Sequence, residues 1–224
     1  MKREIITTSD GSTTIHIPEW NEQYHSKHGA VQEAYHVFIE SGLFHFISQF
    51  NKTPIQILEI GFGTGLNALI TFLEAEKNNL SIDYTGVEAY PVSEKELEQL
   101  NYSALFEHEK AGTYFKALHQ ASWETTHQLT DFFSFEKQQK FFQEIVATQE
   151  FDLIYFDAFG ARVQPELWEE PIFQKMYNAL KPNGILTTYS AKGSAKRAML
   201  SVGFEVEKIP GPPGKREMLR ARKA

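Results

Sequence analysis

The strongest hydrophobic pattern in the chain is a short apolar run that ends at a series of glycines. Residues 55–60 (I-Q-I-L-E-I) are mostly apolar and β-branched, which predicts a strand buried on both faces of a sheet. Apolar residues at helical spacing begin directly after the glycines, at Leu66. A strand, a glycine turn and a helix in this order bring backbone close to a ligand at a helix N-terminus.

The spacing of the glycines narrows the class of ligand. Gly61, Gly63 and Gly65 read G-x-G-x-G, whereas the dinucleotide fingerprint G-x-G-x-x-G would need glycine at Leu66. Glu59 stands two residues before the first glycine. An acidic residue followed by G-x-G-x-G is typical of the loop that holds S-adenosylmethionine in Rossmann-like methyltransferases. A tight turn that binds no ligand is the alternative interpretation.

A second acidic residue follows the next predicted strand. Residues 82–87 predict this strand, and Glu88 comes directly after it. A carboxylate about twenty residues beyond a glycine loop is placed to accept hydrogen bonds from ribose hydroxyls. The alternative is an acid at the start of a helix over residues 92–100.

The third informative stretch is F-D-L-I-Y-F-D-A-F at residues 151–159. Residues 153–156 predict another buried strand, with Asp157 at its carboxyl end. Ligands bind at this edge of an open α/β sheet, so Asp157 and the ring of Phe159 are expected beside the reacting group. Asp157 would otherwise only cap the following turn.

The remaining pattern completes a doubly wound fold. Residues 128–135 predict a third strand and residues 136–147 a helix, and the residue that contacts the adenine stays open near Phe135 or Glu136. Later elements are a helix opening at Pro165, a strand over 185–189, a helix over 193–202 and an antiparallel hairpin over 204–209 and 217–221. Such a closing hairpin is typical of the methyltransferase version of the sheet.

The first 50 residues precede this core. An Asp10-Gly11 turn between two alternating runs predicts a β-hairpin over residues 1–17, and a helical pattern covers residues 31–50. We therefore expect an α/β, Rossmann-like class I methyltransferase with a mostly parallel seven-stranded sheet and an antiparallel C-terminal hairpin. Residues 1–50 would form an extension packed on a catalytic domain at 51–224.

Charge is unevenly distributed along the 224 residues. The net charge is −7, yet residues 181–224 hold ten Lys and Arg against three Glu, which indicates either a patch facing a polyanion or a solvated basic tail. The absence of Cys excludes disulfides and thiolate chemistry, and the histidines match no metal spacing. No signal peptide or membrane-spanning run is visible, so a cytoplasmic protein is expected.

These residues resemble the methyltransferase-domain family of the bacterial bifunctional tRNA 5-methylaminomethyl-2-thiouridine biosynthesis proteins, MnmC. The resemblance covers most of the chain. Its motifs are Tyr24-His25-Ser26 with Gly29, Glu33 and Val37-Phe38, the loop G-F-G-T-G-L-N at 61–67, Asp157-Ala158-Phe159, Pro165-Glu166-Leu167-Trp168, Arg197, Gly203-Phe204 and Lys215-Arg216-Glu217-Met218. Asn21-Glu22 replaces the family's Asp-Asp, and bifunctional members continue beyond the position of Ala224, so we expect a stand-alone methylating half without the FAD-dependent oxidoreductase domain.

The resemblance implies methyl transfer from S-adenosylmethionine to the exocyclic amine of 5-aminomethyl-(2-thio)uridine at the tRNA wobble position. It implies Asp157 as the catalytic residue. It also implies cofactor contacts from Glu59, Gly61, Phe62, Gly63, Thr64, Gly65, Asn67, Glu88 and Asp157, and contacts to the tRNA anticodon stem-loop from Phe159, Lys192, Lys196, Arg197, Lys215 and Arg216. We expect no metal, a monomer, and dependence on an upstream enzyme that installs the aminomethyl group. The alternatives are an aminopropyltransferase of the spermidine synthase kind, a small-molecule methyltransferase, and a non-catalytic RNA-binding module.

Overall fold

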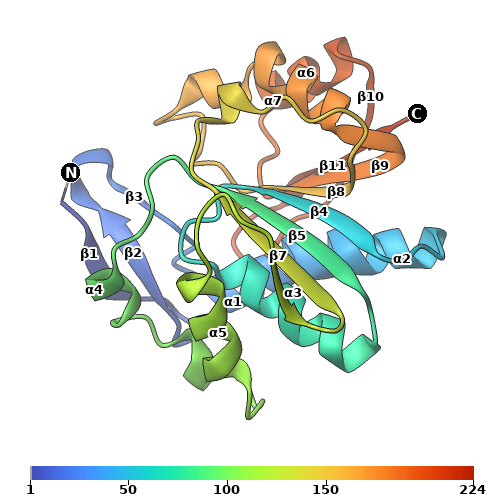
Figure 1. Cartoon of the computed structure of the whole chain (residues 1–224). Helices are drawn as coiled ribbons and strands as arrows, with labels where there is room; N and C mark the ends of the chain where they lie inside the picture. Colours follow the sequence, from blue (N-terminus) through green and yellow to red (C-terminus); the bar gives the residue numbers. More distant parts are fainter. Residues whose placement is uncertain (1) are drawn as a thin grey trace.

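An eight-stranded sheet forms the centre of the molecule in the computed structural model, which describes residues 2–224 (Figure 1). The spatial order of the strands is β10-β11-β9-β8-β4-β5-β7-β6. The four central pairings, β9–β8, β8–β4, β4–β5 and β5–β7, are parallel, and the outer pairings are antiparallel. The strands are β4 (Ile55–Ile60), β5 (Ile82–Val87), β6 (His127–Thr130), β7 (Phe133–Gln138), β8 (Phe151–Phe156), β9 (Leu180–Thr188), β10 (Phe204–Pro210) and β11 (Glu217–Lys223).

Helices cover both faces of this sheet, because its central strands are apolar on both sides. Along β4, Ile57 joins one buried cluster and Leu58 the other, as the alternation of side chains in a strand requires. The first cluster lies under the N-terminal helical segment, α3 (Leu66–Asn78) and α5 (Ala111–Gln120). The second lies under α6 (Glu170–Ala179) and α7 (Gly193–Ser201). The predicted fold class is confirmed.

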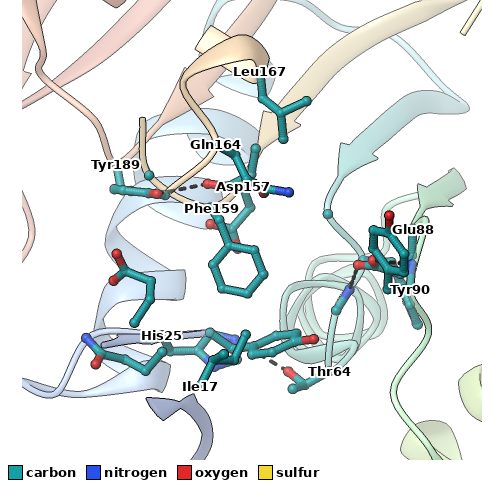
Figure 2. A pocket seen from close by; sticks show the side chains of 18 of the residues that line it. Ile17, His25, Thr64, Glu88, Tyr90, Asp157, Phe159, Gln164, Leu167 and Tyr189 are labelled. Atoms are coloured by element: carbon teal, nitrogen blue, oxygen red, sulfur yellow. Dashed lines mark hydrogen bonds between the residues drawn. The ribbon is translucent and has the colours of Figure 1, made fainter. Parts of the chain in front are cut away.

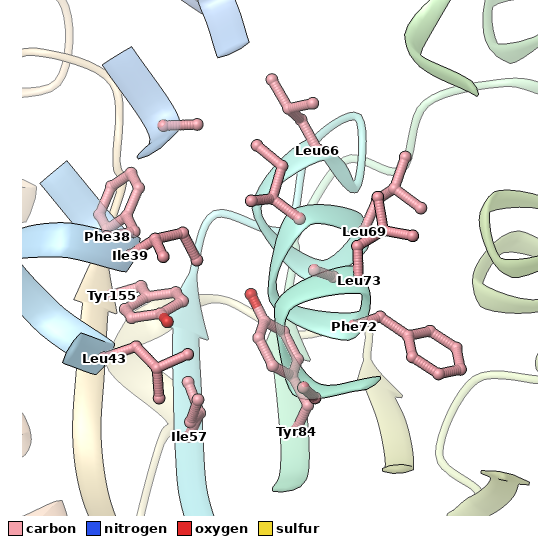
Figure 3. Close-up of a cluster of buried hydrophobic side chains, with 14 of the residues drawn as sticks. Phe38, Ile39, Leu43, Ile57, Leu66, Leu69, Phe72, Leu73, Tyr84 and Tyr155 are labelled. Carbon is pink, nitrogen blue, oxygen red and sulfur yellow. The ribbon is translucent and has the colours of Figure 1, made fainter. Parts of the chain in front are cut away.

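The N-terminal segment shares the core of the sheet. A hairpin of β1 (Glu4–Thr7) and β2 (Thr13–Ile17) continues through the short turn η1 (Pro18–Trp20) into β3 (Glu22–Gln23). One helical run then follows, made of α1 (Ala30–Ala34), the π-helical segment η2 (Tyr35–Phe44) and α2 (His45–Gln49). Figure 3 shows Phe38 and Leu43 of η2 against Tyr155 of β8, and the Phe38 and Tyr155 rings are 5.1 Å apart.

The predicted hairpin and helix in residues 1–50 are confirmed as elements, although Met1 lies outside the described residues. The division into an extension and a domain at 51–224 stays a prediction. Ile15, Val37 and Phe38 belong to the same buried cluster as Ile57 and Tyr155 of the sheet. Removing the first 50 residues would therefore uncover one face of the central strands.

Between residues 128 and 147 the predicted strand is confirmed only in part, and the predicted helix is wrong. This stretch forms two antiparallel strands, β6 and β7, and the helix expected over 136–147 is replaced by the end of β7 and the short turn η4 (Phe142–Glu144). In β7 the side chains of Phe133, Phe135 and Lys137 are buried and alternate with less buried residues. This alternation of buried and less buried residues is the pattern of a strand. With β6, the sheet has eight strands instead of the expected seven.

Short helical turns lie in the connections between the longer elements. Pro165–Trp168 forms a 3-10 turn, η5, so that the helix expected from Pro165 begins as α6 only at Glu170. The helix expected over 92–100 is the single turn α4 (Glu94–Leu97), which begins with a capping box of Ser93 and Glu96. Turns η3 (Tyr102–Leu105) and η4 lie in the following connections. Within residues 2–224 no helix has the length and hydrophobicity needed to span a membrane.

Candidate active site

A cavity of about 800 Å³ opens at the carboxyl ends of the parallel strands β4, β5 and β8. Its floor is the glycine loop after β4, and its walls come from the segments that follow β5, β8 and β9. The N-terminal segment covers it from the other side with residues around Tyr24 and His25. Figure 2 shows Glu88 and Tyr90 across the cavity from Asp157, Phe159 and Tyr189.

The glycine loop is fixed between two strand ends. The Gly61 and Phe62 N–H groups both donate to the carbonyl of Val87, each at 3.0 Å, and the Asp157 N–H donates to the Ile60 carbonyl at 2.9 Å. At Gly61, φ is +90° and a Cβ would lie 2.6 Å from the Asp157 carbonyl oxygen. Only glycine fits there, because the backbone after β8 passes directly against the loop.

Glu88 contacts the glycine loop from the end of β5. Its Oε2 accepts a hydrogen bond from the Gly63 N–H at 3.0 Å, and its Oε1 accepts one from the Tyr90 N–H at 2.9 Å. Each carboxylate oxygen has a second lone pair, so the group retains capacity to accept from the hydroxyls of a ribose. The geometry thus fits the role expected for Glu88.

A chain of hydrogen bonds joins Asp157 to the interior. The amide of Asn67 donates both protons, one to Asp157 Oδ2 and one to Glu59 Oε1, each at 2.9 Å. Glu59 Oε2 accepts from the Tyr84 hydroxyl at 2.8 Å. Glu59 is fully buried and does not line the cavity. It therefore holds the side chain of Asn67, which does line the cavity.

The two carboxyl groups of this chain have raised pKa values. Burial raises the pKa of Asp157 to about 7, with the Asn67 hydrogen bond and the Lys215 charge lowering it and the Glu33 charge raising it. Burial also raises the pKa of Glu59 well above its usual range, against the hydrogen bonds from Tyr84 and Asn67. A carboxyl group that lines a cavity and has a pKa near neutral pH is suited to act as a general base.

Aromatic side chains form the wall beside Asp157. The Phe159 ring meets Tyr24 edge-on at a centroid distance of 5.0 Å and Trp20 at 5.7 Å. Arg162, three residues further on, donates to the Trp20 and Asn21 carbonyls and to the Glu22 carboxylate at 2.8–3.0 Å. The loop after β8 is thereby joined to the N-terminal segment, and planar rings line the space between them.

The structure separates the basic residues expected to face RNA. Lys192 and Lys215 line the cavity, and with Arg216 they also line a shallow depression beside it. Lys196 and Arg197 lie on α7, and neither lines the cavity. Lys215 is directed inward: its ammonium lies 2.7 Å from Glu33 Oε1 and 3.9 Å from the centroid of the Tyr189 ring.

Several site residues were not expected from the sequence pattern alone. Tyr189, Tyr90 and the segment 141–143 line the cavity, whereas Phe135 and Glu136 do not. β7 continues to Gln138, which moves its carboxyl end beyond Phe135. Glu33 and Tyr24 appeared only as motif positions of the family resemblance, because nothing in their local sequence indicates that they reach a site after β4. Among the described residues, His, Asp and Glu side chains form no group of three suited to a metal.

A glycine loop between a buried acid, Glu59, and a cavity-lining acid, Glu88, on a doubly wound sheet with an antiparallel C-terminal hairpin, is the arrangement of the Rossmann-like methyltransferases. The residues fit S-adenosylmethionine, because Gly63 keeps the loop open and Asn67 Oδ1 is buried beside the cavity with no partner in residues 2–224. The pattern of an S-adenosyl-L-methionine-dependent methyltransferase family matches residues 110–224. The chain belongs to this family.

Comparison with curated proteins finds similar sequences over most of the chain. The chain is 29% identical over 214 residues to the tRNA 5-methylaminomethyl-2-thiouridine biosynthesis bifunctional protein MnmC of Idiomarina loihiensis, and 28% identical over 219 residues to that of Nitrosospira multiformis. The matches cover 89% and 92% of this chain and 35% of each relative. The chain therefore spans about a third of the length of these relatives.

Solved structures share the fold. MNMC2 from Aquifex aeolicus superimposes with a TM-score of 0.80 at 23% identity, covering 98% of this chain and 70% of that one. Spermidine synthase from Thermotoga maritima reaches a TM-score of 0.58 at 16% identity, covering 99% and 68%. At these identities the two likenesses establish the architecture alone.

Proposed function

We propose that the protein transfers a methyl group from S-adenosylmethionine to the exocyclic amine of 5-aminomethyl-(2-thio)uridine at the wobble position of tRNA. The observation that carries the proposal is the buried Asp157 carboxyl group, held by Asn67 beside the glycine loop and in a cavity walled by aromatic rings. Relatives named for 5-methylaminomethyl-2-thiouridine biosynthesis support the choice of substrate.

The chemistry requires removal of a proton. An alkylamine with a pKa of about 10.4 is protonated at neutral pH and has no lone pair to offer. Asp157 attracts the incoming ammonium, accepts its proton and leaves the nitrogen free to bond to carbon. When bound, S-adenosylmethionine supplies a methyl group on a cationic sulfur that departs as a neutral thioether. Asn67 holds Asp157 in one orientation throughout, because Glu59 fixes the other proton of the amide.

The wall of the cavity suits a nucleobase. A wobble uridine must leave the anticodon stack before its 5-substituent reaches a buried carboxylate. Phe159 and Tyr24 line the cavity with Asp157, and a uracil stacked against an aromatic side chain is held without reading its sequence neighbours. The exposed Arg216 lies outside the cavity, and the exposed Lys192 lines both the cavity and the depression beside it, where tRNA phosphates would contact them.

The proposal includes further expectations. An aminomethyl group must be installed on the uridine by another enzyme, and the reaction takes place where tRNA is, in the cytoplasm. We expect the protein to work as a monomer. Aminopropyl transfer is not favoured: the likeness to spermidine synthase shows the architecture only, and the named relatives act in tRNA modification.

Mass spectrometry of tRNA nucleosides tests the proposal. Purified protein, S-adenosylmethionine and tRNA carrying 5-aminomethyl-2-thiouridine should give 5-methylaminomethyl-2-thiouridine, with a mass gain of one methyl group on that nucleoside only. A parallel reaction with decarboxylated S-adenosylmethionine and putrescine should give no spermidine. Spermidine formation, or methylation of a free small amine in preference to tRNA, would overturn the proposal.

A further inference from the structure

An ion pair from opposite ends of the chain lies in the cavity. Glu33 belongs to α1 and Lys215 to the loop between β10 and β11, yet Lys215 Nζ is 2.7 Å from Glu33 Oε1. The other oxygen of Glu33 accepts the Ser26 N–H at 2.8 Å. The side chains of Lys215 and Glu33 are only 35% and 13% exposed, so this pair is shielded from water more than a surface pair would be.

Tyr189 fixes the ammonium from a third direction. The Lys215 ammonium lies 3.9 Å from the centroid of the Tyr189 ring, a distance at which a cation is attracted to the ring face. The Tyr189 hydroxyl donates to the Ala158 carbonyl at 2.8 Å, which ties the ring to the residue after Asp157 (Figure 2). Lys215 is therefore held beside the reaction site by a carboxylate and a ring.

Arg216, the next residue, behaves differently. It is exposed and lines the shallow depression outside the cavity, and no ion pair or side-chain hydrogen bond within residues 2–224 engages its guanidinium. Of these two adjacent cations, Lys215 thus faces the interior and Arg216 faces solvent.

We propose that the Glu33–Lys215 ion pair sets the charge of Asp157 for the methyl transfer of the proposed function. Both would be positioning residues of the reaction, and the RNA backbone would be contacted by Arg216 and not by Lys215. The two members of the pair act on Asp157 with opposite signs: the Glu33 charge raises the pKa of Asp157 and the Lys215 charge lowers it. The other ionisable groups whose titration the Asp157 charge affects are Glu59, Tyr84 and Tyr189, and none of them is substituted in these variants.

The consequence is a pair of opposite shifts. In Lys215→Met the unpaired Glu33 charge remains, so the pKa of Asp157 should rise by on the order of one unit. In Glu33→Gln the Lys215 charge remains, so the same pKa should fall. The double variant removes both charges and should return the pKa towards its original position. An ion pair whose charges do not act on Asp157 would not produce shifts of opposite sign that cancel.

Two measurements test this. Carbon-13 NMR titration of labelled aspartate carboxyl groups, with Asp157 assigned from the Asp157→Asn spectrum, reads the shifts without any substrate. Single-turnover methyl transfer to 5-aminomethyluridine tRNA across pH should show the rising limb moved upward in Lys215→Met and downward in Glu33→Gln. Lys215→Arg should keep the original midpoint, because the charge is retained.

Arg216→Met serves as the matched comparison for RNA contact. It should reduce the salt dependence of tRNA binding by about 0.7 in the slope of log K against log salt, and leave the Asp157 titration unchanged. Lys215→Met should shift the Asp157 titration and leave the salt dependence of tRNA binding unchanged. An unchanged Asp157 titration in both Lys215→Met and Glu33→Gln, or a salt slope reduced by Lys215→Met, overturns the inference. Absence of tRNA methylation by the unmodified protein would overturn the proposed function instead, because the NMR shifts do not depend on it.

Discussion

Asp157 must satisfy two opposing requirements, and its surroundings explain how. In the proposed reaction it needs a negative charge to attract an ammonium, yet burial favours the neutral acid and raises its pKa to about 7. The hydrogen bond from Asn67 offsets part of that effect. The group therefore releases and accepts a proton close to neutral pH, where a general base is most effective.

Asp157→Asn should slow methyl transfer by roughly 10²–10⁴-fold, the scale for losing a general base. The amide keeps the shape and an acceptor for Asn67, so the affinity for S-adenosylmethionine should change little. Higher pH should partly restore the rate, because more of the substrate amine is then neutral. Single-turnover kinetics across pH measure this. Asp83→Asn is the matched control: Asp83 lies on β5 and its side chain accepts the Gln56 amide at 2.6 Å, and its replacement should leave the rate unchanged.

Glu59 makes the stability of the fold depend on pH. Its pKa is raised by burial, so the folded state holds a proton that the unfolded chain releases above a pKa of about 4.5. The contribution of this group to stability is full below that pH and is lost as the pH rises towards the folded-state pKa. Stability should therefore fall between pH 5 and pH 8.

Glu59→Gln should remove this dependence, because glutamine keeps an acceptor oxygen for Asn67 and carries no charge. The difference in melting temperature between variant and original protein should grow from pH 5 to pH 8, by ~2–4 °C for each kcal/mol gained. Thermal unfolding followed by circular dichroism at several pH values gives the answer. A melting difference that is constant across pH would mean that Glu59 is ionised in the folded protein.

At the scale of elements, the turn between β4 and α3 decides whether the cofactor fits. Gly63 has φ of +51°, and a Cβ there would lie 3.1 Å from the Tyr24 ring, which can move, whereas the Cβ of Gly61 would meet fixed backbone. Gly63 is therefore the position at which a side chain enters the cavity without breaking the sheet.

Gly63→Val should abolish binding of S-adenosylmethionine and leave the fold intact. Calorimetry with the cofactor and circular dichroism measure the two effects. Gly11→Val is the matched control, because Gly11 also has a positive φ of +84° but nothing lies within 4 Å of its Cβ position. Both variants carry similar backbone strain, so equal loss of binding in the two would attribute the effect to strain and not to the cavity.

The elements that could be predicted are those whose burial leaves a simple pattern. β4 and β8 read as mostly apolar runs, and each is followed by a glycine or an acid that marks the cavity. The first half of β7 falls in the predicted strand over 128–135, whereas its second half was predicted as helix because Lys137, although buried, is a charged residue. Its ammonium donates to the His119 carbonyl and lies over the Trp123 ring, neither of which the sequence places nearby. The same limit applies to the site: Glu59, Glu88 and Asp157 follow from strand ends, whereas Glu33 and Tyr189 depend on long-range packing.

At the scale of the whole molecule, charge is divided between an acidic body and a basic C-terminal fifth. Much of the basic charge is used internally: Lys208 pairs with Glu217, Arg220 with Glu207, and Lys181 with Asp152. The net charge of this region therefore overstates the positive charge that is available for contact with RNA. Arg216 and the exposed residues at the start of α7 remain for phosphate contact.

Arg216→Glu should weaken tRNA binding and leave the affinity for S-adenosylmethionine unchanged. For the unmodified protein, affinity for tRNA should fall steeply between ~50 and ~200 mM salt despite the net charge of −7, because each phosphate contact releases counterions. Filter binding across salt concentrations measures both effects. Lys116→Glu, an exposed change of the same sign on α5, should have little effect. Equal weakening by both variants would indicate a response to net charge alone.

The contact between Glu33 and Lys215 also bears on how the molecule is made. These partners are 182 residues apart in the chain, and Arg162 reaches back about 140 residues to the N-terminal segment. Contacts of such high sequence separation form late, because the loop-closure entropy must be overcome before they stabilise anything. A nascent chain on the ribosome has its glycine loop and Asp157 well before residue 215 is synthesised. In a growing chain, the ion pair that we propose to set the charge of Asp157 therefore forms only after Asp157 itself has been synthesised.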